Sequence, residues 1–287
     1  MRFCSSVTLS LLSLSFILVV SQEVSAFPIT VTTEEDQAVR LYKDRTWEFI
    51  DDVDKQDLAE QIEINVIEAG IMDSMFEDAV NMTYNATDIP NLSVVTSLQD
   101  MFYNVRTFNS DISNWDVSSV TDMSQMFRSD TDFSNNVKHQ FNQDISGWNV
   151  SNVTDMQSMF FNSLFNQPVN NWNVASVTNM KSMFMSSNFN QPLDNWDVSS
   201  VTDMSSMFNR AEAFNQDIGN WNTASVVDMS RMFNNADAFN QDISTKTINA
   251  GTNEEYVAWD VSNVTNMDQM FGFTAIFNQD ITNWDVS

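Results

Sequence analysis

A Met-Phe pair recurs along most of the chain, and no other feature restricts the fold as strongly. The pair stands at residues 75–76, 101–102, 126–127, 159–160, 183–184, 207–208, 232–233 and 270–271, in steps of 26, 25, 33, 24, 24, 25 and 38. A regular period of about 20–50 residues is the signature of stacked structural repeats. We therefore expect one repeat array over residues 61–287, with insertions near residues 134–141 and 244–256 inside the two long steps.

Each repeat carries the same apolar template, which ends on the Met-Phe pair. The unit of residues 141–165 shows it at Ile145, Trp148, Val150, Val153, Met156, Met159, Phe160 and Phe165. Burying one such side chain stabilises by about 1.5–3 kcal/mol, whereas ordering each residue of a coil costs about 1–2 kcal/mol. A single coil is therefore unstable, and neighbours must cover both of its faces. The Trp, Met and Phe rows are predicted to be core rather than a cofactor site.

The period of the apolar pattern changes within each unit. Trp115 and Val117 alternate across one residue, which is the period of a strand. Val120, Met123 and Phe127 then follow at helical spacing, behind a segment of capping-box type. These patterns predict an α/β solenoid of about eight coils, a leucine-rich-repeat-like array of short parallel strands and short helices. Helices need about 8–10 Å and strands about 4.8 Å between neighbours, so the array should curve with the strands on its concave face.

The first 26 residues have the pattern of an export signal, with an apolar run over residues 7–20 before a small-residue cleavage motif at residues 24–26. The run is too short for a membrane span, which needs about 18 apolar residues. The mature chain is expected to be secreted or at the cell surface, with no transmembrane span. Cys4, the only cysteine, would leave with the signal. Import into a plastid is the alternative, because the Phe27-Pro28 junction resembles that of plastid-bound precursors.

Residues 27–60 are predicted to form an N-terminal helical cap on the array. Val39, Tyr42, Trp47 and Ile50 recur there at spacings near three and four, with charged residues between them. The end of a repeat array needs a piece that is polar outside and apolar inside. Trp47 is therefore expected to cover the first coil rather than to stack on a ligand.

The net charge of −27 argues against a nucleic-acid partner and against anionic membrane surfaces, and it favours cationic partners. His139 is the only histidine and is predicted to lie in a polar surface loop. With one histidine and no cysteine in the mature chain, ordinary zinc sites and Cys-His nucleophiles are excluded. We expect no catalytic residue, metal site or cofactor. A hydrolase that uses a carboxylate pair on the solenoid surface is the alternative.

Asn and Asp residues flank the repeated Trp and should point away from the core. They predict a ligand-binding strip on the concave face, made of Asn114, Asp116, Asn149, Asn173, Asn195, Asp197, Asn222 and Asp260. Alternatively, these side chains hydrogen-bond from coil to coil and only stiffen the stack.

Two further polar patterns bear on partners. Aspartates recur at the expected helix starts and at one turn position, where weak Ca²⁺ binding would relieve their mutual repulsion. These residues are Asp122, Asp155, Asp203 and Asp228 in one row and Asp144, Asp217, Asp242 and Asp280 in the other. Neutral residues in the intervening coils dilute the charge and make a metal unnecessary. Asn81, Asn85 and Asn91 are candidate glycosylation sites, since each precedes x-Ser/Thr.

The segment FNQDISGWNVSNVTDMQSMF at residues 141–160 closely resembles the unit of the BspA-type leucine-rich-repeat surface proteins. The same repeat is abundant in mycoplasma surface lipoproteins, and the resemblance extends over residues 88–287. It implies a secreted or cell-surface protein that acts as a non-catalytic binding or adhesion module. The ligand would be a protein or glycan of a cell surface or matrix. The resemblance carries over no catalytic residues.

Overall fold

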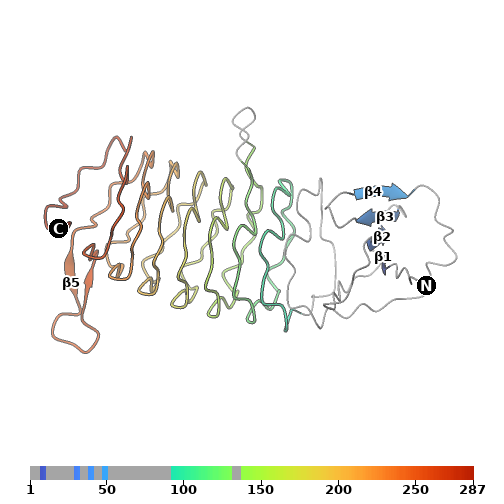
Figure 1. Ribbon diagram of the computed structural model, residues 1–287, viewed down its shortest axis with the longest axis horizontal. Coiled ribbons are helices and arrows are strands. Elements are labelled where there is room, and N and C mark those ends of the chain that lie inside the picture. The colour runs from blue at the N-terminus through green and yellow to red at the C-terminus, as the bar shows by residue number, and fades with distance from the viewer. Residues whose placement is uncertain (1–6, 11–28, 33–37, 42–46, 51–91, 131–136) are drawn as a thin grey trace. The chain divides into compact units, whose positions relative to one another are not determined.

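The computed structural model describes residues 7–10, 29–32, 38–41, 47–50, 92–130 and 137–287 (Figure 1). The chain divides into two units, Met1–Gly70 with Asn85–Val94 and Ile71–Tyr84 with Val95–Ser287. The described part of the first unit is a four-stranded sheet in the order β1-β2-β3-β4, in which β1 pairs with β2 in parallel and the other pairs are antiparallel. Its strands are β1 (Val7–Ser10), β2 (Ile29–Thr32), β3 (Ala38–Leu41) and β4 (Trp47–Ile50).

The predicted helical cap over residues 27–60 is wrong, because its described residues form strands. In the pairing of β3 with β4, Val39 lies opposite Phe49 and Leu41 lies opposite Trp47. Within each strand these apolar residues are two positions apart, which is the period of a β-strand and not of a helix. The side chain of Trp47 lies outside the described part, and the export signal over residues 1–26 remains a prediction.

The second unit is a stack of coils, which Figure 1 shows side by side along a nearly straight axis. Backbone N–H groups of one coil donate to carbonyl groups of the next, as from Met156 to Asn179 at 3.0 Å and from Met180 to Asp203 at 2.9 Å. Single parallel bridges join one position of successive coils. They link Ser97, Asp122, Asp155, Asn179, Asp203, Asp228 and Asn266 in that order.

The predicted α/β solenoid is wrong. The described residues contain no helix, and none therefore that could cross a membrane. Within the described part of the second unit, the only extended strands are the antiparallel pair β5 (Lys246–Ile248) and β6 (Tyr256–Ala258). Each coil is instead wound from tight turns joined by segments without regular secondary structure. The predicted curvature and concave face depended on helices that widen one side of the stack. The described part of the stack has no helices, so this reason for curvature does not apply.

Left-handed backbone conformations explain why the helical pattern does not produce a helix. They recur four residues apart within a coil, as at Ser158 and Asn162, with φ of 55° and 50°. A left-handed residue ends a right-handed helix. The N–H of Ser158 donates to the carbonyl of Lys181 in the next coil, at 2.8 Å, while the N–H of Phe161 closes a turn onto Ser158 at 3.1 Å. Turn and ladder bonds thus replace helical bonds at the same apolar spacing.

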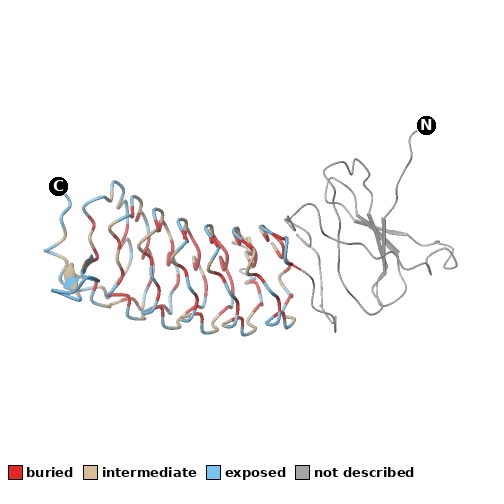
Figure 2. Cartoon of the chain, turned by 90° about the horizontal axis from the view of Figure 1, so that it is seen from below, coloured by how far each residue is buried: buried red, intermediate tan, exposed pale blue. Residues whose placement is uncertain are grey.

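The predicted core rows are confirmed, and Figure 2 shows that buried residues, drawn in red, recur from coil to coil. Met156, Phe160 and Phe165 are completely buried, and the two Phe rings stack at a centroid distance of 4.0 Å. Each phenylalanine also stacks on its counterpart in the next coil, at 5.7 Å for Phe160 and Phe184. Tryptophan adds a polar link, since the indole Nε1 of Trp172 donates to the carbonyl of Ile145 at 3.1 Å. The same bond recurs from coil to coil at Trp148, Trp196, Trp221, Trp259 and Trp284.

The left-handed positions lead to a test of this turn-built coil. Ser186 has a φ of 58°, and its N–H donates to the carbonyl of Asn209 at 2.8 Å. Ser186→Gly should be neutral or raise the free energy of unfolding by up to about 1 kcal/mol, because relief of strain outweighs the flexibility of glycine. Ser186→Val should lower it by about 1–2 kcal/mol or more. Urea unfolding of both variants checks this, and a more stable valine variant would refute the left-handed assignment.

Candidate functional site

The hairpin of β5 and β6 is the place where the described stack departs most clearly from its repetition. It projects from one edge of the stack near the C-terminal end (Figure 1). The phenol of Tyr256 donates to the carbonyl of Asn220 at 2.6 Å, and the hydroxyl of Thr245 donates to the carbonyl of Trp259 at 2.8 Å. Gly219 lets the hairpin base approach, since a Cβ there would lie 2.5 Å from the carbonyl oxygen of Asp242.

A groove of about 390 Å³ lies between this hairpin and the coil edges at residues 194–199 and 220–222. We call it the hairpin groove. The coils contribute acidic and amide side chains, and the hairpin contributes a carboxylate and an aromatic ring. Its principal polar lining residues are Asp194, Asn195, Asp197, Asn222, Glu254 and Tyr256.

The coil wall of the groove is held by short local hydrogen bonds. Trp196 is buried and donates from Nε1 to the carbonyl of Val169 at 2.9 Å, so the next residue, Asp197, turns outward. The Oδ1 of Asp197 accepts the N–H of Ser199 at 3.0 Å, which closes a small turn. Asn222 occupies the same position one coil later and accepts the N–H of Ala224 at 3.2 Å. These two lining side chains are therefore positioned before any ligand arrives.

The lining is negatively charged. It contains the carboxylates of Asp194, Asp197 and Glu254, and no Lys or Arg is among the lining residues. Lys246, at the start of the hairpin, pairs with Asp242 at 3.7 Å. Burial raises the pKa of Tyr256 above its usual value of 10.0, and the negative charge of Asp197 raises it further. The phenol therefore stays neutral at physiological pH.

The predicted strip divides between the groove and the rest of the coil edge. Asn195, Asp197 and Asn222 line the groove. The remaining members, Asn114, Asp116, Asn149, Asn173 and Asp260, lie outside it. The oxygen of Asp116 accepts a bond from Ser118 at 3.1 Å, and that of Asn149 accepts one from Ser151 at 3.2 Å. The side chains of Asp116 and Asn149 therefore close turns within their own coils. The alternative that such side chains hydrogen-bond from coil to coil does not hold for these two residues.

A different asparagine row links the coils, and the sequence analysis missed it. The N–H of Asn166 donates to the Oδ1 of Asn142 at 2.8 Å, and the N–H of Asn190 donates to Asn166 at 2.8 Å. The row comprises Asn109, Asn142, Asn166, Asn190, Asn215, Asn240 and Asn278. The sequence feature that marks this row is the Phe-Asn dipeptide at the end of each unit. A turn alone would accept several residue types, so the repeated asparagine indicates a specific bond of its side chain.

The predicted surface position of His139 is wrong, because its side chain is completely buried. Nδ1 accepts the N–H of Phe141 at 3.2 Å, so Nε2 carries the proton and donates to the carbonyl of Phe102 at 3.1 Å. The ring edge meets Phe127 at a centroid distance of 5.8 Å. Burial lowers the pKa of His139 to about 4, which keeps the ring neutral. Polar neighbours in the sequence concealed that the side chain of this residue lies in the core although the residue belongs to the predicted insertion.

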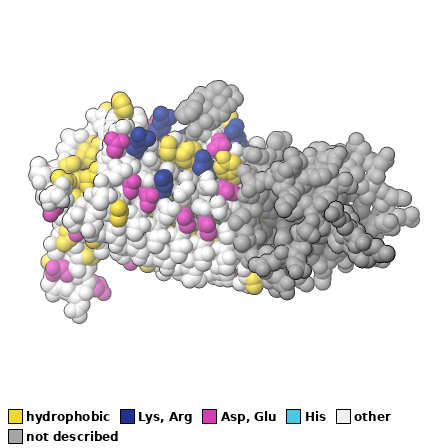
Figure 3. Space-filling model, viewed as in Figure 1, with side chains coloured by type: hydrophobic (Ala, Val, Ile, Leu, Met, Phe, Trp, Pro, Cys, Tyr) yellow, Lys and Arg dark blue, Asp and Glu magenta, His cyan; other side chains and the backbone are white. Residues whose placement is uncertain are grey.

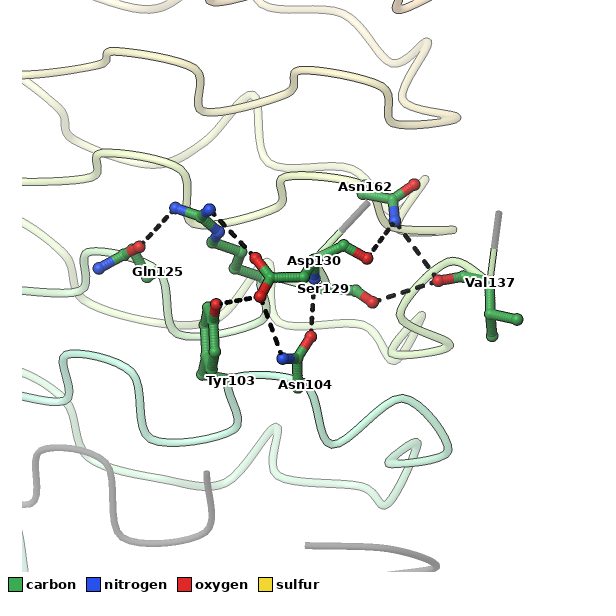
Figure 4. Close-up of polar contacts among 8 residues, drawn as sticks. Tyr103, Asn104, Gln125, Ser129, Asp130, Val137 and Asn162 are labelled. Atoms are coloured by element: carbon green, nitrogen blue, oxygen red, sulfur yellow. Dashed lines mark hydrogen bonds and ion pairs between the residues drawn. The ribbon is translucent and has the colours of Figure 1, made fainter. Parts of the chain in front are cut away.

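A second polar cluster, shown in Figure 4, links residues 128–130 to Val137 and Asn162, near the first predicted insertion. The carboxylate of Asp130 accepts bonds from Tyr103 at 2.6 Å and from Arg128 at 3.2 Å. Burial raises the pKa of Asp130, but Tyr103, Arg128 and a bond from the amide of Asn104 together outweigh burial and lower the pKa overall. The amide of Asn162 donates to the carbonyls of Asp130 and Val137, each at 3.4 Å. With its carboxylate occupied by internal partners, this cluster has a structural role.

The aspartate row at the expected helix starts also closes turns. The Oδ1 of Asp155 accepts the N–H of Gln157 at 2.8 Å, and its Oδ2 accepts the amide of Asn179 at 3.0 Å. Burial raises the pKa of Asp155, with a smaller contribution from Asp122 and Asp203. Among the described residues, no group of three His, Cys, Asp or Glu side chains could hold a metal ion. Asn81, Asn85 and Asn91, the candidate glycosylation sites, lie outside the described residues.

Comparison with known proteins gives one family. The family model described as "Mycoplasma protein of unknown function, DUF285" matches residues 70–186, 161–257 and 246–287. No curated protein and no solved structure gives a significant match.

Proposed function

The chain belongs to the DUF285 family, and on this premise we propose that it is a secreted or cell-surface protein of BspA type that binds ligands without catalysing a reaction. The ligand is a protein segment or a glycan of a cell surface or matrix. The hairpin groove carries this proposal, because it is a built concavity in an otherwise repetitive surface.

The size and rigidity of the hairpin groove both suit binding. Its volume of about 390 Å³ falls within the range of about 300–1,000 Å³ that is usual for ligand pockets. The turn bonds of Asp197 and Asn222 hold the coil wall, and the bond from Tyr256 to Asn220 holds the hairpin against it. Preorganised polar groups reduce the entropy that binding costs. In repeat proteins, insertions of this kind gather on one face, which is often the binding face.

A matched pair of variants tests the groove. Asn222→Ala and Asn173→Ala remove the same turn bond in different coils, and only Asn222 lines the groove. Full-length protein is screened on glycan and peptide arrays, and the captured ligands are then titrated. We expect Asn222→Ala, alone or with Tyr256→Ala, to weaken binding at least about tenfold, equivalent to about 1.4 kcal/mol. Asn173→Ala should leave the affinity unchanged.

Two results would count against this proposal. Equal losses for Asn222→Ala and Asn173→Ala would show that coil stability, not the groove, governs binding. The hydrolase alternative predicts that a captured oligosaccharide is cleaved, so mass spectrometry of the recovered ligand should reveal shorter products. Intact ligand after prolonged incubation supports a binding module.

A further inference from the structure

Charge is segregated within the coils of the stack. Between residues 92 and 240, every Lys and Arg lies in one half of the repeat. This half runs from the first Met of the Met-x-x-Met-Phe segment to the following Phe-Asn dipeptide. The Lys and Arg residues are Arg106, Arg128, Lys138, Lys181, Arg210 and Arg231. The other half, which contains the Trp and the outward turns, carries aspartate as its only charged residue. Figure 3 shows the Lys and Arg side chains gathered along one part of the stack, where acidic side chains lie among them, and acidic side chains without Lys or Arg beside them at the hairpin.

The hairpin groove lies on the acidic half and adds to its charge. Asp194 and Asp197 come from the coil, Glu254 comes from the hairpin loop, and the lining supplies no cation to neutralise them. Tyr256 presents an aromatic ring to the same space, and its bond to Asn220 fixes the ring in place. A carboxylate set beside an aromatic ring suits a Lys or Arg side chain, which gains both charge pairing and cation–π contact.

We propose that the hairpin groove binds a basic peptide segment, with a lysine or arginine side chain inserted between the coil wall and the hairpin. This inference rests on the binding function proposed above and specifies its ligand. Asp197 and Glu254 approach the cationic head from the two walls, and Tyr256 contacts its alkyl stem and charge. A neutral glycan would use the amides of the same groove and have no need of its carboxylates.

The chain offers an isosteric test of this charge. Asp197→Asn removes one negative charge but keeps the oxygen that closes the turn, and Asn149, Asn173 and Asn222 already do this in other coils. Asp116→Asn makes the same change at the equivalent position outside the groove. The probe is a fluorescein-labelled peptide of alternating lysine and glycine. Its twin with every lysine acetylated has the same length without the charge.

We expect the full-length protein to bind the lysine peptide, and Asp197→Asn to weaken this binding about tenfold or more. Asp116→Asn should change the affinity less than twofold, and the acetylated peptide should not bind. Affinity should also fall as salt is raised, because the groove is open to solvent. Equal losses for the two Asp→Asn variants, or equal binding of the acetylated peptide, would overturn the inference.

A second probe, labelled chitotetraose, distinguishes failure of the basic-peptide inference from failure of the proposed binding function. Chitotetraose is a neutral oligosaccharide. If chitotetraose binding depends on Asn222 and Tyr256 but not on Asp197, the groove is a glycan site and the basic-peptide inference fails alone. If binding of neither probe responds to Asn222→Ala or Tyr256→Ala, the binding function of the groove fails with it.

Discussion

Replacing Trp172 by alanine is expected to lower the free energy of unfolding by about 3–5 kcal/mol. The Trp172 side chain is 2% exposed and packs on Phe160 at a ring-centroid distance of 6.5 Å. Alanine would leave a cavity between two coils and remove one of the two donors to the carbonyl of Ile145, the other being the N–H of Trp148. Because each coil is covered only by its neighbours, the loss should reach the cooperative unfolding of the whole stack.

Trp172→Phe is the matched control for the indole bond. It retains most of the apolar area but removes the Nε1 donor, while the carbonyl of Ile145 keeps the N–H of Trp148. The loss of this hydrogen bond should therefore cost less, about 0.5–1.5 kcal/mol. Urea unfolding followed by far-ultraviolet circular dichroism measures both variants in the full-length chain. An alanine variant within about 1 kcal/mol of the wild type would contradict the assignment of this tryptophan to the core.

Acidification is expected to destabilise the protein between pH 6.5 and pH 4 through His139. Its pKa is about 4 in the folded state, because burial disfavours the charged ring, and about 6.5 in the unfolded chain. Above pH 6.5 both states hold a neutral ring, and the residue adds no pH dependence. As pH falls below 6.5, the unfolded state binds a proton that the folded state does not. The free energy of unfolding should therefore decline by about 3 kcal/mol in total by pH 4.

His139 is the chain's one histidine, so a variant of this residue isolates its contribution. The raised pKa of Asp155 acts in the opposite direction, because its folded state binds a proton more readily and gains stability as pH falls. Carboxyls with lowered pKa values, such as those of Asp130 and Asp242, affect stability at a lower pH than His139. Their contribution to the free energy of unfolding is fully present above the usual carboxyl pKa of 3.8, and it is lost as pH falls through their folded-state pKa values. His139→Gln keeps an amide that can donate to the carbonyl of Phe102 but does not titrate. Urea midpoints at pH 7.5, 6.0, 5.0 and 4.5 should fall more steeply for the wild type than for this variant, and parallel curves would exclude the buried neutral histidine.

The rows of large apolar residues could be predicted from the sequence, because burial depends on side-chain type and position in the repeat. The core contains Trp148, Met156 and Phe160, as their place in the repeat predicted. Neighbouring coils bury these side chains, because a single coil cannot bury them alone. The backbone conformation could not be predicted in the same way. A spacing of three and four residues is common to a helix and to a chain of tight turns, and both place the same side chains inward.

The candidate site shows a similar division. The outward position of Asp197 and Asn222 follows from the buried tryptophan before each of them. Their association with Glu254 and Tyr256 does not follow, since the insertion carrying those residues folds back on earlier coils by contacts that no local pattern encodes. His139 illustrates the opposite error, in which polar sequence neighbours suggested a loop although the side chain completes the core.

The sequence by itself therefore determined the repeat, its period, its insertions and the identity of its buried rows. These follow from hydrophobic burial, which depends on the order of residue types along the chain. The tertiary structure alone decided that the coils are made of turns and that one insertion encloses a groove. Backbone N–H groups at residues such as Ser158 have a carbonyl partner available in the next coil, and this partner, absent from any isolated segment, replaces the helical one.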